Sequence, residues 1–175
     1  MIDREQLDEI ILQHDTNDWW QPELFIQNTK HLLPRELEIL ADPPPEAENH
    51  NCFIHALGLS EDTTVIKATN GFIYDTFIKH LISIGELERT TDPQPGDFVV
   101  YQDLEQYPDH LTHMGVLQSD SSVISKWAWG PLFKHTLWDV PASYGNNIFY
   151  IKGISATAAQ RLFETYQEFN QKPAS

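Results

Sequence analysis

The sequence predicts an α+β domain in which helices come first and a group of antiparallel strands follows. Up to about residue 85, apolar residues recur mainly at helical spacing. Between about residues 98 and 152 they form short runs rich in β-branched and aromatic side chains, which are typical of strands. Short turns connect these runs, and short connections favour antiparallel neighbours. Helices followed by such strands indicate an α+β fold.

The chain has the size and composition of one domain. It has 175 residues, of which 41% are hydrophobic, enough for a sizeable core. We therefore expect a single domain over residues 1–175. Its single cysteine excludes an internal disulfide.

The first part of this domain is expected to be a helical arm over residues 1–41. Apolar spacing predicts amphipathic helices over residues 2–14 and 22–33, and a further turn of helix over residues 35–40. The proline-rich stretch at residues 42–46 must be extended, since proline cannot continue a helix. It separates the arm from the rest of the chain.

The next helix contains the cysteine. Asn51 is a candidate N-cap for a helix starting at Cys52, and Gly58 is its C-terminal stop. Residues 60–62 are suited to cap another short helix, and residues 71–84 form a strongly amphipathic pattern that stops at Gly85.

The strands come after this helical part. The candidates are residues 98–101, 112–117, 122–127 and 148–152, and residues 133–137 are a candidate edge strand. A final helix is predicted over residues 155–171, capped by Ser155.

Cys52 is the first candidate functional residue. A helix N-terminus carries partial positive charge, which stabilises a thiolate and lowers the pKa of the thiol. A cysteine nucleophile also needs an imidazole to accept its proton, and His113, at the start of a predicted strand, is the best candidate. Gly115 lies on the same strand face and leaves room for close packing beside His113. The alternative is that Cys52 is a small buried hydrophobic residue.

These features together resemble the papain-like NlpC/P60 and CHAP superfamily of cysteine peptidases and amidases. The resemblance covers roughly residues 49–152. The matching segments are Asn51-Cys52-Phe53 at a helix start, Pro95-Gly96-Asp97-Phe98-Val99-Val100-Tyr101 as a first strand, His113-Met114-Gly115-Val116-Leu117 as the histidine strand, and Val123-Ile124-Ser125-Lys126-Trp127 as the next strand.

The resemblance implies a catalytic centre with Cys52 as nucleophile and His113 as general base. The position of the residue that orients the histidine holds Ser125, which departs from the family's usual His, Asn, Gln or Glu. A serine hydroxyl can bond to imidazole but offers no charge to stabilise imidazolium. The other candidates for a third member are His135, Asp139 and Asn147; further alternatives are a Cys-His dyad or lost activity.

The same resemblance suggests groups around the substrate. The Cys52 backbone N–H, with the side chain of Asn49 or Asn51, is expected to bind the oxyanion. Lys126 and Trp127 lie near the expected cleft and are candidate substrate contacts, although packing in the core is the alternative for the tryptophan.

A metal site is the main rival interpretation. His50, Cys52 and His55 lie close in sequence, and His110 with His113 adds a second histidine pair. No regular helix places the second pair on one face, so we expect neither a metal nor a cofactor.

The expected activity is that of a thiol-dependent hydrolase or transferase acting on amide bonds of a peptide or small substrate. The alternative is a catalytically silent protein of the same fold that acts as an acidic binding module. The net charge of −15 argues against nucleic acid and anionic membranes as partners and permits a basic protein partner. With no leader sequence and no long apolar run, the expected compartment is the cytoplasm.

Overall fold

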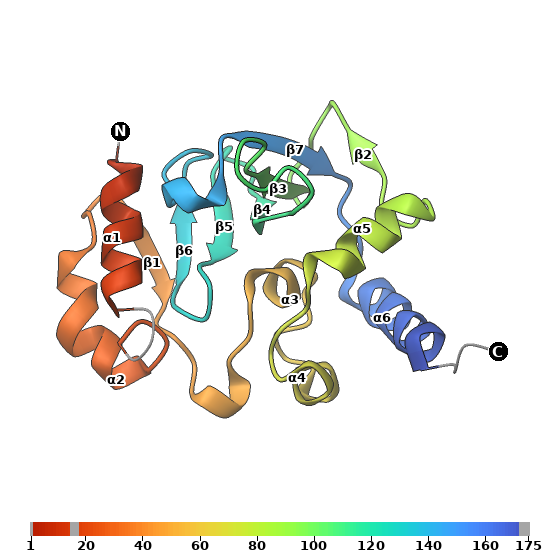
Figure 1. Cartoon of the computed structure of the whole chain (residues 1–175), viewed down its shortest axis with the longest axis horizontal. Coiled ribbons are helices and arrows are strands. Elements are labelled where there is room, and N and C mark those ends of the chain that lie inside the picture. Colours follow the sequence, from red (N-terminus) through yellow and green to blue (C-terminus); the bar gives the residue numbers. More distant parts are fainter. Residues whose placement is uncertain (1, 15–17, 172–175) are drawn as a thin grey trace.

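A seven-stranded antiparallel sheet forms the centre of the computed structural model, which describes residues 2–14 and 18–171 (Figure 1). The strand order is β1-β6-β5-β4-β3-β7-β2. The strands are β1 (Glu38–Ala41), β2 (Arg89–Thr90), β3 (Phe98–Gln102), β4 (His113–Leu117), β5 (Val123–Lys126), β6 (Leu132–His135) and β7 (Asn147–Ile151). In the described residues the α-helices are α1 (Arg4–His14), α2 (Pro22–Leu24), α3 (Cys52–Ala56), α4 (Thr63–Thr69), α5 (Asp75–Ser83) and α6 (Ala156–Gln171). The predicted α+β class is confirmed.

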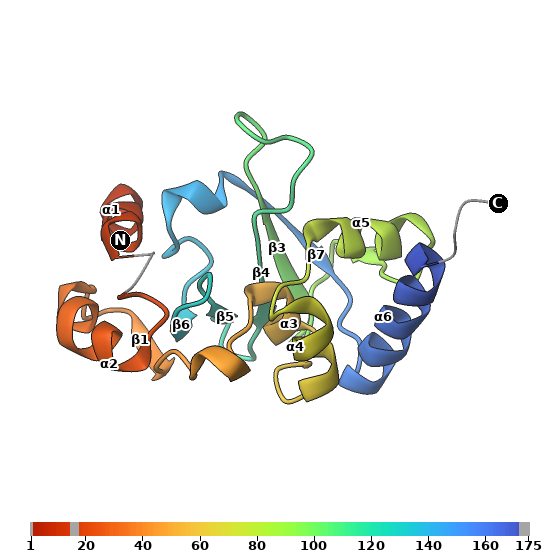
Figure 2. The same ribbon diagram turned by 60° about the horizontal axis from the view of Figure 1, so that its bottom comes forward.

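The two faces of the sheet pack against different helices. Alternation along β3 sends Phe98 and Val100 to one side, where they join apolar residues of α3, α4, α5 and α6 in what we call the helical core. Val99 and Tyr101 point to the other side and join α1, Trp19, Phe25 and Phe133 in the arm core. Figures 1 and 2 show α1 and α6 at opposite ends of the molecule. The N-terminal arm therefore completes the second face of the sheet.

The helix that carries the cysteine is short and firmly capped. The Asn51 side chain accepts a hydrogen bond from the Ile54 N–H at 3.3 Å, as expected for an N-cap. Gly58 ends the helical turn with a φ of +73°, a conformation that glycine adopts without strain. The sequence prediction of this helix is confirmed.

The helices predicted downstream of α3 are present with small changes. Asp62 caps α4 by accepting hydrogen bonds from the Thr64 and Val65 N–H groups, both at 3.0 Å. The helix predicted over residues 71–84 starts only at Asp75, because Gly71 lies in a turn with positive φ and the carbonyls of Gly71 and Ile73 accept hydrogen bonds from Asn51 at the start of α3. The final helix has the predicted extent, and Ser155 Oγ accepts a bond from the Ala158 N–H.

The N-terminal arm differs from the prediction in its last part. The helix predicted over residues 22–33 is present as α2, a π-helical turn at Phe25–Thr29 and a 3₁₀ turn at Lys30–Leu32. The helical turn predicted over residues 35–40 is wrong, because β1 pairs there with β6. Strand β6 is consequently an inner strand between β1 and β5 and does not form the predicted edge. Pairing with a distant strand outweighed a weak local helical signal.

No helix within residues 2–14 and 18–171 combines the length and apolar character needed to cross a membrane.

Candidate functional site

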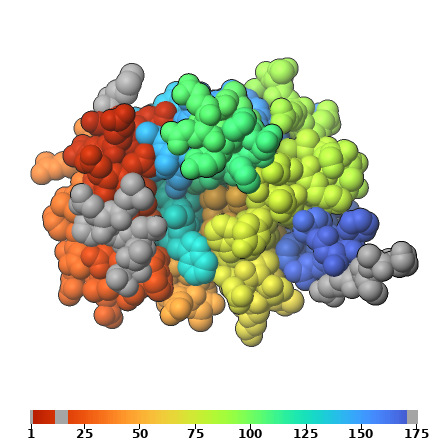
Figure 3. Space-filling model, viewed as in Figure 1, coloured from red at the N-terminus to blue at the C-terminus, as the bar shows by residue number. Residues whose placement is uncertain are grey.

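Cys52 lines a pocket of about 280 Å³, which we call the Cys52 pocket. The side chain is buried, with 6% of its surface exposed. Helix α3, which it begins, packs against β4 and β5. In Figure 3, atoms of the segment near residue 50 are visible in a hollow beneath the projecting loop that connects β3 and β4. Cys52 is thus a lining residue of this pocket although most of its surface is buried.

The Cys52 thiol is protonated in the resting structure. Burial raises its pKa to about 11, and this effect outweighs the backbone N–H groups of Met114, Phe53 and Cys52 itself, which lower the pKa. The lowered pKa expected from the sequence is therefore wrong for this state. Helix α3 has only 5 residues, so its dipole is small, while the desolvation penalty is large.

Lys126 supplies positive charge to the thiol. It lies on β5, opposite Met114 when the β4–β5 register is continued, and it is 2% exposed. Its ammonium group donates a hydrogen bond to the Gly130 carbonyl, and no described carboxylate pairs with it. Burial lowers the pKa of Lys126 to about 7, and the nearby Cys52 thiolate counteracts that shift. Lys126 thus influences the sulfur electrostatically; it is not among the residues that line the Cys52 pocket, and its role as a substrate contact stays a prediction.

His113 begins β4 and lines the same pocket as Cys52. Its side chain, 1% exposed, lies on the arm-core face of the sheet, where its ring stacks on Tyr144 with centroids 4.0 Å apart and planes at 14°. Burial lowers its pKa well below the usual value, so the ring is neutral near pH 7. Among the described residues, the Nε2 atom has no hydrogen-bond partner.

Cys52 and His113 meet only where β4 begins. The backbone N–H of Met114, the residue that follows His113, lowers the pKa of the thiol, but Cys52 packs in the helical core, on the face of the sheet away from the His113 side chain. Within the described part of the chain, no hydrogen bond joins the two side chains. The structure therefore brings the two residues to one pocket without an established thiol–imidazole bond.

Ser125, the expected orienting residue, has other partners. Its hydroxyl lies 2.7 Å from His135 Nε2 and accepts the Trp127 indole N–H at 3.2 Å. His135 Nδ1 lies 2.7 Å from the Thr136 carbonyl, which can only accept, so Nδ1 carries the proton. Ser125 must then donate its hydroxyl proton to His135 Nε2. This network commits Ser125 and His135 to each other, and neither completes a hydrogen bond to His113 Nε2.

The two asparagines beside Cys52 hold the backbone in place. Asn49 donates to the Trp129 carbonyl at 2.8 Å and accepts from the His50 N–H at 2.8 Å. Asn51 caps α3 and donates to the Ile73 carbonyl at 2.8 Å. Asn49 does not line the Cys52 pocket, whereas Asn51 does. Their amide groups are engaged in structural bonds, which leaves the first N–H groups of α3 as the freer donors.

The remaining candidates lie away from the pocket. Trp127 is fully buried in the arm core, so it has no surface to present to a substrate. The Asp139 carboxylate accepts from Thr136 at 2.7 Å, and Asn147 donates to Gln102 at 3.3 Å. We assign none of the three a part in the site.

The histidines of the rival metal interpretation have other neighbours than a shared metal site would give them. His50 and His55 stack on each other with centroids 5.9 Å apart, while His110 lies 3.4 Å from the Asp75 carboxylate. Among the described residues, no group of three or more His, Cys, Asp or Glu side chains could hold a metal ion.

Several residues of the pocket had no signal in the sequence. Tyr144 covers the face of the His113 ring, and the Thr112 hydroxyl donates to its carbonyl at 2.6 Å. Phe72 and Tyr74 also line this pocket. Each is an ordinary aromatic in its own segment, and only the fold places these three rings around Cys52.

Comparisons with protein-family models, with characterised proteins and with solved structures find no significant match to this chain.

Proposed function

We propose that the chain catalyses thiol-dependent hydrolysis or acyl transfer at amide bonds, with Cys52 as nucleophile and His113 as general base. The observation that carries the proposal is that both residues line one pocket while His113 Nε2, although buried, has no partner among the described residues. Buried polar atoms are normally hydrogen-bonded, and unpaired ones concentrate where a substrate or a water is to bind.

The protonation states support a general-base mechanism. A pKa of about 11 for Cys52 and a lowered pKa for His113 describe a neutral thiol and a neutral imidazole that line one pocket. The sulfur attacks the acyl carbon as its proton passes to the imidazole, which then delivers that proton to the departing nitrogen. Water, or another amine, attacks the resulting thioester and restores the thiol. Lys126 favours the anionic sulfur during the attack.

The oxyanion requires donors close to the sulfur. The Cys52 and Phe53 N–H groups belong to the first turn of α3, where backbone donors have no intrahelical acceptor. Both lie close enough to the sulfur to lower the pKa of the thiol. We assign them to the oxyanion, with Asn51 holding the turn in position.

The resemblance to the papain-like NlpC/P60 and CHAP superfamily agrees with this assignment in the order of its parts. The cysteine helix, β3, the histidine strand β4 and β5 follow one another as in that family. The chain differs from that family at the position of the third catalytic residue. Ser125 stands there, and its hydroxyl bonds to His135 instead of His113. We therefore propose a dyad.

Covalent trapping tests this proposal. The protein is incubated with p-nitrophenyl acetate, and the modified residue is located by mass spectrometry of its peptides. We expect a hydroxylamine-sensitive acetyl thioester on Cys52, absent in Cys52→Ser and formed roughly 100-fold more slowly in His113→Ala. His31→Ala, an exposed histidine outside the pocket, is the matched control. Equal acylation in His113→Ala and the native protein would remove His113 from the mechanism.

A catalytically silent binding protein of the same fold is the second candidate. It is favoured by the Ser125–His135 bond, which leaves the imidazole of His113 without the orienting partner that active members of such families have. In that case Cys52 acquires no acetyl group at neutral pH, and ligands bind the pocket equally well in Cys52→Ala.

A further inference from the structure

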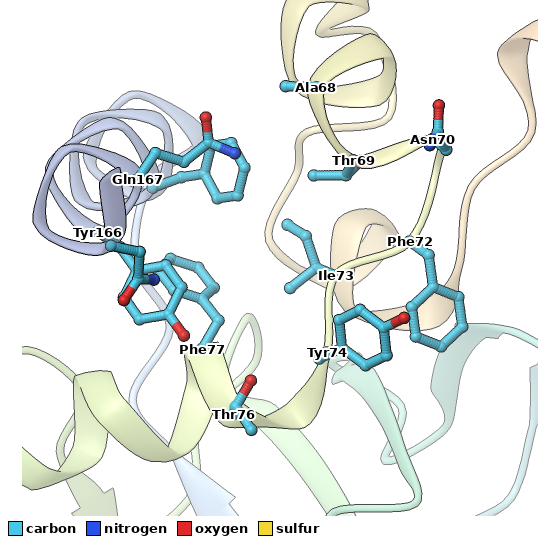
Figure 4. A pocket seen from close by; sticks show the side chains of 12 residues that line it. Ala68, Thr69, Asn70, Phe72, Ile73, Tyr74, Thr76, Phe77, Tyr166 and Gln167 are labelled. Carbon is cyan, nitrogen blue, oxygen red and sulfur yellow. The ribbon is translucent and has the colours of Figure 1, made fainter. Parts of the chain in front are cut away.

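A second pocket, of about 400 Å³, lies on the helical side of the molecule, and we call it the α6 pocket. Figure 4 shows Tyr166 and Gln167 of α6 facing Thr69 and Asn70 at the end of α4 across an open gap, with Tyr74 beside the gap. It is larger than the Cys52 pocket, and neither the proposed nucleophile nor its base lines it.

The walls of the α6 pocket are uncharged. None of its lining residues is acidic, basic or histidine, although the chain has 26 acidic and 11 basic residues. The lining includes the aromatic rings of Phe77 and Tyr166 and the side-chain amides of Asn70 and Gln167. Among the described residues, the side-chain amides of Asn70 and Gln167 form no hydrogen bond with another residue. Such a surface suits an uncharged group with an apolar body and amide hydrogen-bonding atoms.

Two aromatic residues connect this pocket to the Cys52 pocket. Phe72 and Tyr74 line both, and their ring centroids are 4.9 Å apart. Both are exposed, Phe72 by 38% and Tyr74 by 68%. They therefore form a low wall between two neighbouring pockets, and one extended molecule can contact both sides of it.

The wall is held in place by the start of the cysteine helix. The Asn51 N–H donates to the Gly71 carbonyl at 2.9 Å, and the Asn51 side chain donates to the Ile73 carbonyl at 2.8 Å. A side chain at Gly71 would come within 2.2 Å of the Asn49 carbonyl oxygen, so the segment lies tightly against residues 49–51. The position of the wall is thus fixed relative to Cys52, which is the preorganisation that a specificity site needs.

We propose that the α6 pocket is a specificity subsite that holds an uncharged, preferably aromatic residue of a peptide-like substrate whose reacting carbonyl lies at Cys52. The inference rests on the proposed function for its link to the thiol. It adds that the pocket formed by α4, α6 and the Phe72–Tyr74 wall selects an uncharged residue of the substrate.

Binding is tested in Cys52→Ala, where no covalent step interferes. The ¹⁵N-labelled variant is titrated with N-acetyl-L-phenylalaninamide and, separately, with N-acetyl-L-glutamate α-amide. We expect saturable amide shifts in residues 68–77 and 163–170 with the phenylalanine compound and at least fivefold weaker binding of the glutamate compound. Absence of shifts in these two segments, or equal affinity for both compounds, overturns the subsite.

The link to the thiol is tested in the native chain with two probes of equal length, chloroacetyl-Gly-Phe-amide and chloroacetyl-Gly-Glu-amide. Each rate of Cys52 alkylation is divided by the rate with chloroacetamide in the same protein. We expect the phenylalanine probe to be favoured, and Gln167→Lys to shift the ratio roughly fivefold toward the glutamate probe, as one new charge contact would do. Thr165→Lys, which adds the same charge outside the pocket, is the control and leaves the ratio unchanged.

The two proposals fail in different ways. If p-nitrophenyl acetate does not acylate Cys52, the proposed function fails, and the titration of Cys52→Ala still decides whether the pocket binds. If the phenylalanine amide binds but the two probes alkylate Cys52 equally fast, the pocket is not a subsite of the thiol and this inference fails while the proposed function stands.

Discussion

Buried neutral histidines are the most pronounced feature at the scale of single residues. Burial lowers the pKa of His50, His55 and His135 to about 4, and that of His113 also falls well below its usual value. The folded protein therefore keeps these rings neutral under conditions in which the unfolded chain would protonate them. A neutral ring is the form that a general base requires, but the same desolvation lowers the proton affinity of His113 and so makes it a weaker base than a free imidazole.

We predict that the free energy of unfolding falls as the pH drops from about 6.5 to about 4. In that window the unfolded chain binds protons that the folded chain does not, so stability present above pH 6.5 is lost on acidification. The expected loss is about 1 to 2 kcal/mol per buried histidine at pH 5. Urea unfolding at pH 7 and pH 5 measures it. An unchanged free energy of unfolding would mean that these rings bind protons at pH 5 as readily in the folded protein as in the unfolded chain.

Only part of the residue-level site could be predicted from the sequence. The residue types and local patterns of Cys52 and His113 single them out, and the structure brings both to one pocket, while their catalytic roles stay a prediction. The bond between Ser125 and His135 was not predicted, because it depends on β6 lying beside β5, and the sequence suggested β6 only as an edge strand. The raised pKa of Cys52 likewise depends on burial, which no local pattern reports.

At the scale of elements, the close contact between β4 and β5 supports the histidine strand. A Cβ atom at Gly115 would lie 2.5 Å from Val123 Cγ1 and 2.9 Å from Ser125 Cβ. The sequence suggested that something packs closely at this glycine, and β5 is what does so.

We predict that Gly115→Ala lowers the free energy of unfolding by about 2 kcal/mol, because the added methyl forces the two strands apart. Chemical denaturation compares it with Gly85→Ala. Gly85 has open space around it, so alanine there costs only the backbone strain of its φ of +80°, about 1 kcal/mol. Equal losses in both variants would show that the strands adjust without cost.

Elements with strong local signals were predicted well, and elements created by pairing were not. Helices α1, α3 and α6 follow clear periodicity and caps, and β3, β4 and β7 are apolar runs between turns. Strand β1 has a mostly exposed burial pattern and so lacks the alternation that marks a half-buried strand. Strand β1 forms because its backbone pairs with β6, which lies about 90 residues later in the chain.

At the scale of the whole molecule, the N-terminal arm supports the sheet from the side away from the cysteine helix. Trp19 is fully buried in the arm core, and its indole donates to the Trp127 carbonyl at 3.0 Å. A Cβ at Gly130 would lie 2.0 Å from the same indole nitrogen. No described residue of the arm lines the Cys52 pocket. The described part of the arm therefore packs on the sheet and does not line the pocket.

We predict that Trp19→Ala lowers the free energy of unfolding by about 3 to 5 kcal/mol and leaves acylation of the folded protein within about twofold of the native rate. Trp138→Ala, at a tryptophan that is 39% exposed, is the control and costs less. Denaturation and acylation are both measured at low temperature, where the variant stays folded. Clearly faster acylation in Trp19→Ala would identify the arm as an inhibitory cover.

The pH dependence of Cys52 acylation tests the central claim, that His113 acts on Cys52 as a general base, most directly. Acetylation by p-nitrophenyl acetate is followed by mass spectrometry from pH 6 to 10 in the native protein and in His113→Ala. With a neutral His113 as base, we predict a nearly constant rate from pH 6 to 8 in the native protein. In His113→Ala we predict a rate that is roughly 100-fold lower at pH 7 and rises about tenfold per pH unit as thiolate forms toward a pKa of about 11. Equal acylation rates in the two proteins, both rising tenfold per pH unit, would contradict the claim that His113 acts as the base.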